Sequence, residues 1–126
     1  MSQDTIADAL NMIRNAKKAR KTVVKVKRIS NLLIDILKIM KDKNAIKKYK
    51  INSKEQYIEI TLGDIVDCKA IKPRFTVKKD QIEKYRRRYL PARNIGSVIV
   101  STSIGLMTHD QAQEMNIGGC LVAYFY

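Results

Sequence analysis

The apolar residues of this sequence change their spacing along the chain, and this pattern restricts the fold more than any other feature. Four apolar residues between positions 33 and 40 recur at helical spacing, which predicts an amphipathic helix over residues 30–42. Apolar and polar residues then alternate over residues 57–62, as is typical of a half-buried strand. The almost continuously apolar residues 121–126 predict a strand at the centre of a sheet. Helical and strand spacings in one chain predict an α+β fold.

The order of the predicted elements divides the chain into two small lobes. Residues 1–64 predict an α-β-α-β-β lobe, and residues 65–126 predict a lobe that is mostly antiparallel β with short helices. A chain of 126 residues is long enough for both lobes to bury a modest core. In the second lobe Pro73 either ends a strand or marks an edge strand, and Gly118-Gly119 is predicted to end the last helix.

The charge of the chain is strongly positive and unevenly distributed. Lys and Arg number 25 against 12 Asp and Glu, which gives a net charge of +13. A field of this size attracts polyanions, most commonly nucleic acid. Residues 14–28 hold eight basic residues and no acidic one, residues 69–93 hold ten basic residues, and residues 94–126 hold none. We expect the first two segments to attract phosphates, and the alternatives are a general polyanion binder or a basic surface without a partner.

A run of hydroxyl residues, Ser101-Thr102-Ser103, follows an apolar strand pattern. Gly105 then permits a turn with positive φ. Thr108 and Gln111 have the spacing of a capping box, which predicts a helix beginning at His109. The sequence therefore predicts a hydroxyl-rich loop between a strand and a helix N-terminus, a place suited to a phosphate, a ribose or a base edge.

An alternative interpretation of this segment is catalytic, with Ser101 or Ser103 as nucleophile and His109 as base in a small hydrolase or transferase. However, no acidic residue stands in a motif that would orient the histidine. The G-x-S-x-G, Walker A and dinucleotide-binding motifs are also missing from the sequence. We therefore expect no enzymatic activity, no cofactor and no small-molecule substrate, and we expect His109 to be a surface or capping residue.

The cysteines do not indicate a metal site. Cys68 and Cys120 lie far apart, and with a single histidine they do not make a four-ligand zinc site. We expect both to be free, buried thiols in a reducing compartment. No apolar run approaches the roughly 20 residues of a membrane span, and no signal-peptide pattern is present. The sequence predicts a cytoplasmic protein without a membrane partner.

Several segments together resemble a known family. These are Ser-Thr-Ser-x-Gly-x-Met-Thr at 101–108, Gly118-Gly119 with the aromatic end, and Ala7-Asp8-Ala9-Leu10 near the start. They are similar to the family of small-subunit ribosomal protein eight, and Ile71-Lys72-Pro73-Arg74-Phe75 resembles its archaeal and eukaryotic branch. The resemblance covers nearly the whole chain. It implies a structural protein of the ribosome that binds the central domain of small-subunit rRNA, aids its assembly and lies beside other small-subunit proteins.

The resemblance also implies which residues contact RNA. The hydroxyl loop would do so through Ser101, Thr102, Ser103 and Gly105, with Met107 packing nearby. The first lobe would contribute Asn15 and Ser30. The charge pattern adds five basic residues and one aromatic residue: Arg14, Lys25, Lys27, Arg28, Arg86 and Tyr85. Tyr85 either stacks on a base or, as its helical spacing favours, packs beneath the neighbouring arginines.

Two positions depart from the family pattern. Asn31 stands where a lysine is common, and Cys120 stands where a charged residue is usual. Neither departure touches the hydroxyl loop, so rRNA binding remains the main prediction. Regulatory binding to an mRNA is a further alternative that the sequence does not separate from it.

Overall fold

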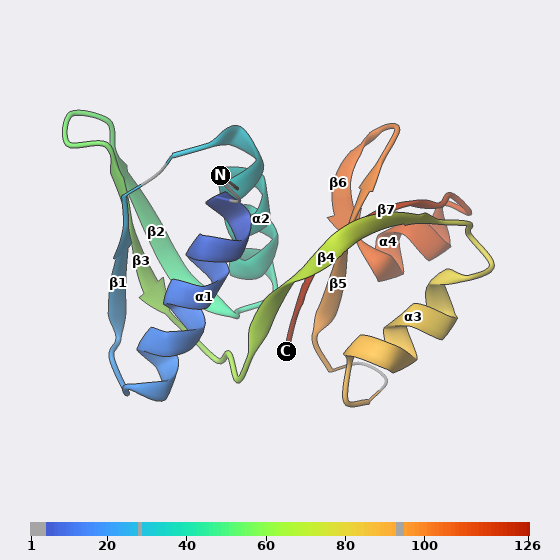
Figure 1. Ribbon diagram of the computed structural model, residues 1–126, viewed down its shortest axis with the longest axis horizontal. Helices are drawn as coiled ribbons and strands as arrows, with labels where there is room; N and C mark the ends of the chain where they lie inside the picture. The colour runs from blue at the N-terminus through green and yellow to red at the C-terminus, as the bar shows by residue number, and fades with distance from the viewer. Residues whose placement is uncertain (1–4, 28, 93–94) are drawn as a thin grey trace. The chain divides into compact units, whose positions relative to one another are not determined.

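The computed structural model describes residues 5–27, 29–92 and 95–126, and it has the mixed α+β architecture that the sequence predicts (Figure 1). The chain divides into two compact units, residues 1–69 and 70–126. The predicted boundary between the lobes after residue 64 stays a prediction. Arg28, one of the predicted RNA contacts, lies outside the described residues.

Unit 1 consists of two helices and a three-stranded sheet. Its elements are, in chain order, α1 (Thr5–Lys18), β1 (Val23–Val26), α2 (Asn31–Asp42), β2 (Ile46–Asn52) and β3 (Tyr57–Leu62). Strand β3 lies between β1 and β2 and is antiparallel to both. Figure 1 shows α1 and α2 on the same side of this sheet. Within the described part of unit 1, no helix or strand covers the other face.

Burial in unit 1 follows the two sequence periods. Ile58, Ile60 and Leu62 of β3 are buried, whereas the residues between them are only half-buried. The four apolar residues of α2 that the sequence places on one face are buried as well. The helix is capped by Ser30, whose Oγ accepts a hydrogen bond from the Leu33 N–H at 3.1 Å. The core of unit 1 therefore lies between the helices and one face of the sheet.

A buried thiol lies in this core. Cys68 is fully buried, and its Sγ donates a hydrogen bond to the Leu10 carbonyl at 3.3 Å. Burial, with a smaller contribution from the charge of Asp67, raises the pKa of the Cys68 thiol from 9.0 to about 12. Cys120 is half-buried, so the expectation of two buried thiols is wrong for this residue. It lies near one end of its strand, where the neighbouring elements cover it only in part.

We expect the free energy of unfolding to fall as the pH rises from 9 towards 12. In this range the unfolded chain releases the Cys68 proton that the folded chain retains, so the unfolded state binds fewer protons. The slope contributed by this one group approaches about 1.4 kcal/mol per pH unit. Denaturant titrations at pH 8, 9.5 and 10.5 measure it, with Cys68→Ala as the control. An equal slope in that variant would show that other groups cause the loss.

Unit 2 contains a four-stranded sheet and two short helices. Its elements are β4 (Cys68–Val77), which begins at the end of unit 1, then α3 (Ile82–Tyr89), β5 (Ser97–Thr102), β6 (Gly105–Thr108), α4 (His109–Glu114) and β7 (Gly119–Phe125). The strand order is β4-β7-β5-β6. The C-terminal strand β7 is therefore internal, as its continuous apolar pattern predicts, and Pro73 lies in a strand at the edge of the sheet.

The glycine pair after α4 has a different role from the predicted one. Asn116, with φ of 56°, supplies the left-handed residue that follows the helix. A Cβ at Gly118 would lie 2.3 Å from the Val77 carbonyl oxygen, and a Cβ at Gly119 would lie 2.5 Å from the Ser101 carbonyl oxygen. The prediction that Gly118-Gly119 ends the helix is wrong, because both residues are needed for close contact between backbone segments.

Candidate nucleic-acid interface

The predicted hydroxyl loop is the tip of a β-hairpin. Strands β5 and β6 pair antiparallel from Ile99 opposite Thr108 to Thr102 opposite Gly105, which leaves Ser103 and Ile104 as the turn. The helix α4 begins only after β6, four residues from the tip, or roughly 13 Å at the rise of a strand. The capping box at Thr108 is present, but the expectation of a hydroxyl loop directly at a helix N-terminus is wrong, because β6 lies between them.

The side chain of Thr102 fixes the conformation of this tip. Its Oγ1 donates a hydrogen bond to the Gly105 carbonyl at 2.8 Å and accepts one from the Ile104 N–H at 3.3 Å. Gly105 has φ of 129°, a conformation that L side chains rarely adopt. Ser101, Ser103 and Gly105 are exposed. The hairpin tip thus presents two exposed hydroxyls on a turn that internal hydrogen bonds hold in place.

Strand β7 brings a further segment to the side of the hairpin. Ser101 pairs with Cys120 in the β5–β7 ladder, and Gly119 permits the close backbone contact described above. The position that departs from the family pattern therefore lies directly beside a predicted RNA contact. A half-buried thiol at this place is not a basic group, so this side of the hairpin presents hydroxyls and backbone groups in place of the charged residue usual in the family.

Two residues at the base of the hairpin are buried. Met107 is 8% exposed and belongs to the apolar core of unit 2, so its side chain supports the hairpin from inside and does not reach its surface. His109 is 3% exposed, and its Nδ1 accepts a hydrogen bond from the Val98 N–H at 3.1 Å. The prediction of a surface histidine is wrong, because the ring serves as a buried acceptor for a strand N–H and is not placed to act as a base for an exposed serine.

Helix α3 presents fewer basic residues than its sequence indicates. Arg86 is 8% exposed, and its Nε and Nη2 donate hydrogen bonds to Glu83 Oε1 at 2.8 and 2.6 Å. These hydrogen bonds raise the pKa of the Arg86 guanidinium. Tyr85 is half-buried and packs edge-to-face on Phe75, with 4.9 Å between the ring centroids, while Lys84 lies over its ring. Arg86 and Tyr85 therefore act mainly in the packing of unit 2.

In unit 1 some side chains of the basic segment 14–28 are held by an ion pair or a hydrogen bond, and others are exposed. Arg14 Nε lies 2.7 Å from Asp67 Oδ1, and Lys17 Nζ donates to the Gly63 carbonyl at 3.2 Å. Lys27 is exposed, and so is Lys25, whose ammonium lies 5.1 Å from the centroid of the Tyr57 ring. Asp67, which pairs with Arg14, lies outside residues 14–28, so a count of charges within that segment does not reveal this ion pair.

The two remaining residues carried over from the family have different environments. Asn15 is exposed on α1, and it lines an open groove between α1 and β1. Ser30 is half-buried, and its hydroxyl caps α2. A ligand at Ser30 would therefore meet a hydroxyl that already accepts a hydrogen bond from the helix.

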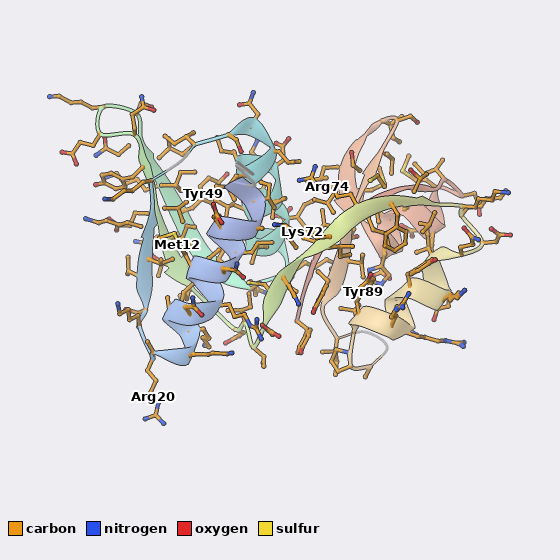
Figure 2. The ribbon with its side chains drawn as sticks, viewed as in Figure 1. Met12, Arg20, Tyr49, Lys72, Arg74 and Tyr89 are labelled. Carbon is orange, nitrogen blue, oxygen red and sulfur yellow. The ribbon has the colours of Figure 1, made fainter. Side chains whose placement is uncertain are left out.

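Two exposed groups of basic residues extend the sequence predictions: Lys48 and Lys50 were not predicted, and Lys72 and Arg74 were covered only by the basic segment 69–93. On the uncovered face of the unit 1 sheet, Lys50 and Lys25 pair on either side of Glu59, and Lys48 pairs with Thr61. On β4, Lys72 and Arg74 point to the same exposed side of the strand (Figure 2). The available signal was the alternation of basic and apolar residues within each strand, which places the basic side chains on one face.

The described residues show neither a candidate metal cluster nor a membrane-spanning helix. They contain no group of three or more His, Cys, Asp or Glu side chains that could hold a metal ion. None of the described helices has the length and apolar character needed to cross a membrane. The two α+β units, with a hydroxyl hairpin and several basic surfaces, are typical of a non-catalytic protein that recognises nucleic acid.

Comparisons with known proteins identify the family within this class. The family model described as "Ribosomal protein S8" matches residues 4–126. The small ribosomal subunit protein uS8 of Nanoarchaeum equitans is 42% identical over 129 residues, and that of Picrophilus torridus is 39% identical over 129 residues. Both alignments cover 100% of this chain and 100% of the relative.

This chain belongs to the ribosomal protein S8 family. It is therefore a structural component of the small ribosomal subunit that functions in translation, located in the ribosome in the cytoplasm, and it is not an enzyme. These statements agree with the predictions made from the sequence. The residues that contact RNA, and the part of the rRNA that is bound, are not settled by family membership.

Proposed function

We propose that this protein binds the central domain of small-subunit rRNA through the hairpin tip and holds that domain in place during assembly. The observation that carries the proposal is the pair of exposed hydroxyls, Ser101 and Ser103, on a turn fixed by Thr102. Such a surface is suited to unstacked bases and 2′-hydroxyls, which are the groups that sequence-specific RNA recognition uses.

The hairpin does not supply the electrostatic attraction. Residues 94–126 contain no Lys or Arg, whereas exposed lysines lie on the sheet of unit 1 and on β4. In this proposal the basic residues contact phosphates and set the affinity for any RNA, while the hairpin distinguishes one RNA shape from another.

The structure changes the set of residues that we propose for these contacts. Arg14 and Arg86 are paired with Asp67 and Glu83, and Met107 is part of the core, so we assign them supporting roles. Asn15, Ser30 and Tyr85 remain secondary candidates. The main proposed contacts are the exposed residues of the hairpin and of the basic strands: Ser101, Ser103, Gly105, Lys25, Lys27, Lys48, Lys50, Lys72 and Arg74.

We expect Ser103→Ala to weaken binding to a central-domain rRNA fragment by about 1–2 kcal/mol, because it leaves a polar group of the RNA unpaired. Binding to a random RNA duplex of equal length should not change. Filter-binding titrations at 150 mM salt measure both affinities. Thr76→Ala, which removes an exposed hydroxyl from β4, is the matched control. Equal weakening of both RNAs by Ser103→Ala would contradict the proposed role of the hairpin.

The same titrations test the central-domain assignment and the basic strands. Wild-type protein should prefer the fragment over the random duplex by a factor of about one hundred or more, since specific binding typically exceeds non-specific binding by roughly 10³–10⁷. Lys50→Gln should weaken both RNAs alike and lower the salt slope by roughly one unit. Equal affinity of the wild type for both RNAs would show that the protein binds polyanions without preference for this rRNA domain.

A further inference from the structure

Strand β1 has a free edge whose backbone groups point away from the sheet. In the order β1-β3-β2 it pairs only with β3 among the described residues. The Leu62 N–H donates to the Thr22 carbonyl at 2.8 Å, and hydrogen-bonded and non-hydrogen-bonded pairs alternate along an antiparallel ladder. Val24 and Val26 therefore bond to β3. Val23 and Lys25 direct their N–H and C=O groups to the free edge.

A groove follows this edge. It has a volume of about 500 Å³, and α1 forms one wall while β1 with the preceding turn forms the other. Its apolar part includes Met12, which is 39% exposed, and the exposed Ala19, both from the α1 side. Val23 also borders the groove, but its side chain, opposite Thr61, lies on the uncovered face of the sheet. Figure 2 shows Met12 between α1 and β1. The full lining is Met12, Asn15, Ala16, Ala19, Lys21, Val23, Val24 and Lys25. A helix beside a free strand edge, with exposed apolar side chains between them, is a geometry that accepts an added strand.

The opposite edge of the same sheet, strand β2, is protected against the addition of another strand, whereas β1 is not. Strand β2 carries Lys47, Lys48 and Lys50, and lysines on an edge strand oppose pairing with another chain. Strand β1 has the sequence Val-Val-Lys-Val, with a single lysine. The protein thus blocks strand addition at β2 and leaves it possible at β1.

We propose that an extended, acidic segment of a partner protein pairs with β1 as a fourth strand and places alternate side chains in the groove. Lys21 lines the groove, and no acidic residue does, so Asp or Glu in the segment complements its charge. The Lys25 side chain lies on the other face of the sheet, over Tyr57, and is left for the RNA. The edge offers backbone donors and acceptors in alternation, which an extended polypeptide matches residue by residue. The phosphates of an RNA backbone only accept, and its 2′-hydroxyls are not spaced to match the ladder of a strand. This contact is additional to the proposed rRNA contact at the hairpin. The four residues of β1 limit the paired segment to about the same length.

The proposal is tested in assembled small subunits that contain the full chain. A photo-crosslinking residue is placed at Ala19, which is exposed and lines the groove. Attachment to a polypeptide segment rich in Asp or Glu is the expected result. Attachment to rRNA, or a yield no higher than that of the same crosslinker at the exposed Lys43, would overturn the proposal.

Two proline variants test the backbone pairing. Val23→Pro removes a free-edge N–H without breaking the ladder to β3, and prolines are tolerated at such positions. It should reduce the crosslink yield at least fivefold. Ile51→Pro removes a free-edge N–H of β2, because Ile51 faces away from β3 in the same alternation, and it should leave the yield unchanged. Equal yields in wild type and Val23→Pro would refute strand addition.

Amide hydrogen exchange provides a measurement that needs no variant and therefore does not depend on the folding of Val23→Pro. In assembled subunits, exchange at the Val23 and Lys25 amides should slow at least tenfold relative to the free protein. The amides of Tyr49 and Ile51, on the free edge of β2, should not slow to the same extent. Unchanged exchange at Val23 and Lys25 would overturn the proposal whatever the crosslink shows.

Discussion

Replacing Gly118 with alanine is expected to lower the free energy of unfolding of unit 2 by about 3 kcal/mol, the upper part of the usual range for an overpacked site. The new Cβ would lie 2.3 Å from the Val77 carbonyl oxygen and 3.0 Å from Lys78 Cα. Both are backbone atoms, so no side-chain rotation relieves the clash. Strands β4 and β7 are neighbours in the sheet, and we expect them to separate at this end.

Asn116→Gly is the matched control for this prediction. It lies two residues away, has φ of 56°, and glycine adopts that conformation without strain, so we expect a change of only a few tenths of a kcal/mol. Denaturant unfolding followed by tyrosine fluorescence measures both variants, since Tyr89 and Tyr124 stack in unit 2 with 5.2 Å between ring centroids. A loss below about 1 kcal/mol in Gly118→Ala would mean that the backbone adjusts easily, and the close contact with Val77 would then not require glycine at position 118.

Ile60→Ala is expected to destabilise unit 1 by about 3–4 kcal/mol. Ile60 lies on the central strand of the sheet and is 0% exposed, so the truncation leaves a cavity that the helices and strands on either side fill only in part. Hydrogen exchange of the amides of β3, measured under native conditions, reports the loss for unit 1 separately from unit 2.

Thr61, next to Ile60 in the chain, is the control position for this prediction. Thr61 is half-buried on the other face of β3, and Thr61→Ala should cost less than 1 kcal/mol. If both variants lost the same stability, the assignment of the two faces of the sheet from alternation would be wrong. If Ile60→Ala also destabilised unit 2 by the same amount, the two units would unfold as one.

Much of the fold could be predicted from the sequence, because the relevant signals are local. The stripe over residues 33–40, the alternation over 57–62 and the apolar C-terminal strand each reflect which side of an element is buried. The capping box at Thr108 was recognisable for the same reason, since both of its hydrogen bonds lie within four residues. The short strand β6 was missed because its four residues carry too little periodicity to be distinguished from a loop.

The candidate site was predicted less completely. The exposed hydroxyls of Ser101 and Ser103 follow from the sequence motif and a turn. By contrast, the environment of Arg14 depends on the distant Asp67, and Met107, expected to pack near the RNA contacts, lies in the core of unit 2. The Arg86–Glu83 pair is local, three residues apart on one helix, and was overlooked although its spacing stands in the sequence. Lys48 and Lys50 were overlooked because their relation to Lys25 exists only across the paired strands.

The sequence by itself determined the α+β class, the excess of positive charge, the separation of that charge from the hydroxyl motif, and the family. Each of these depends on composition or on residues near one another in the chain. Only the tertiary structure decided which cations are exposed, why Gly118 and Gly119 must be glycine, and that β1 has a free edge beside a groove. These features depend on strand pairing and packing between distant segments, and a linear pattern does not specify the distances between such segments.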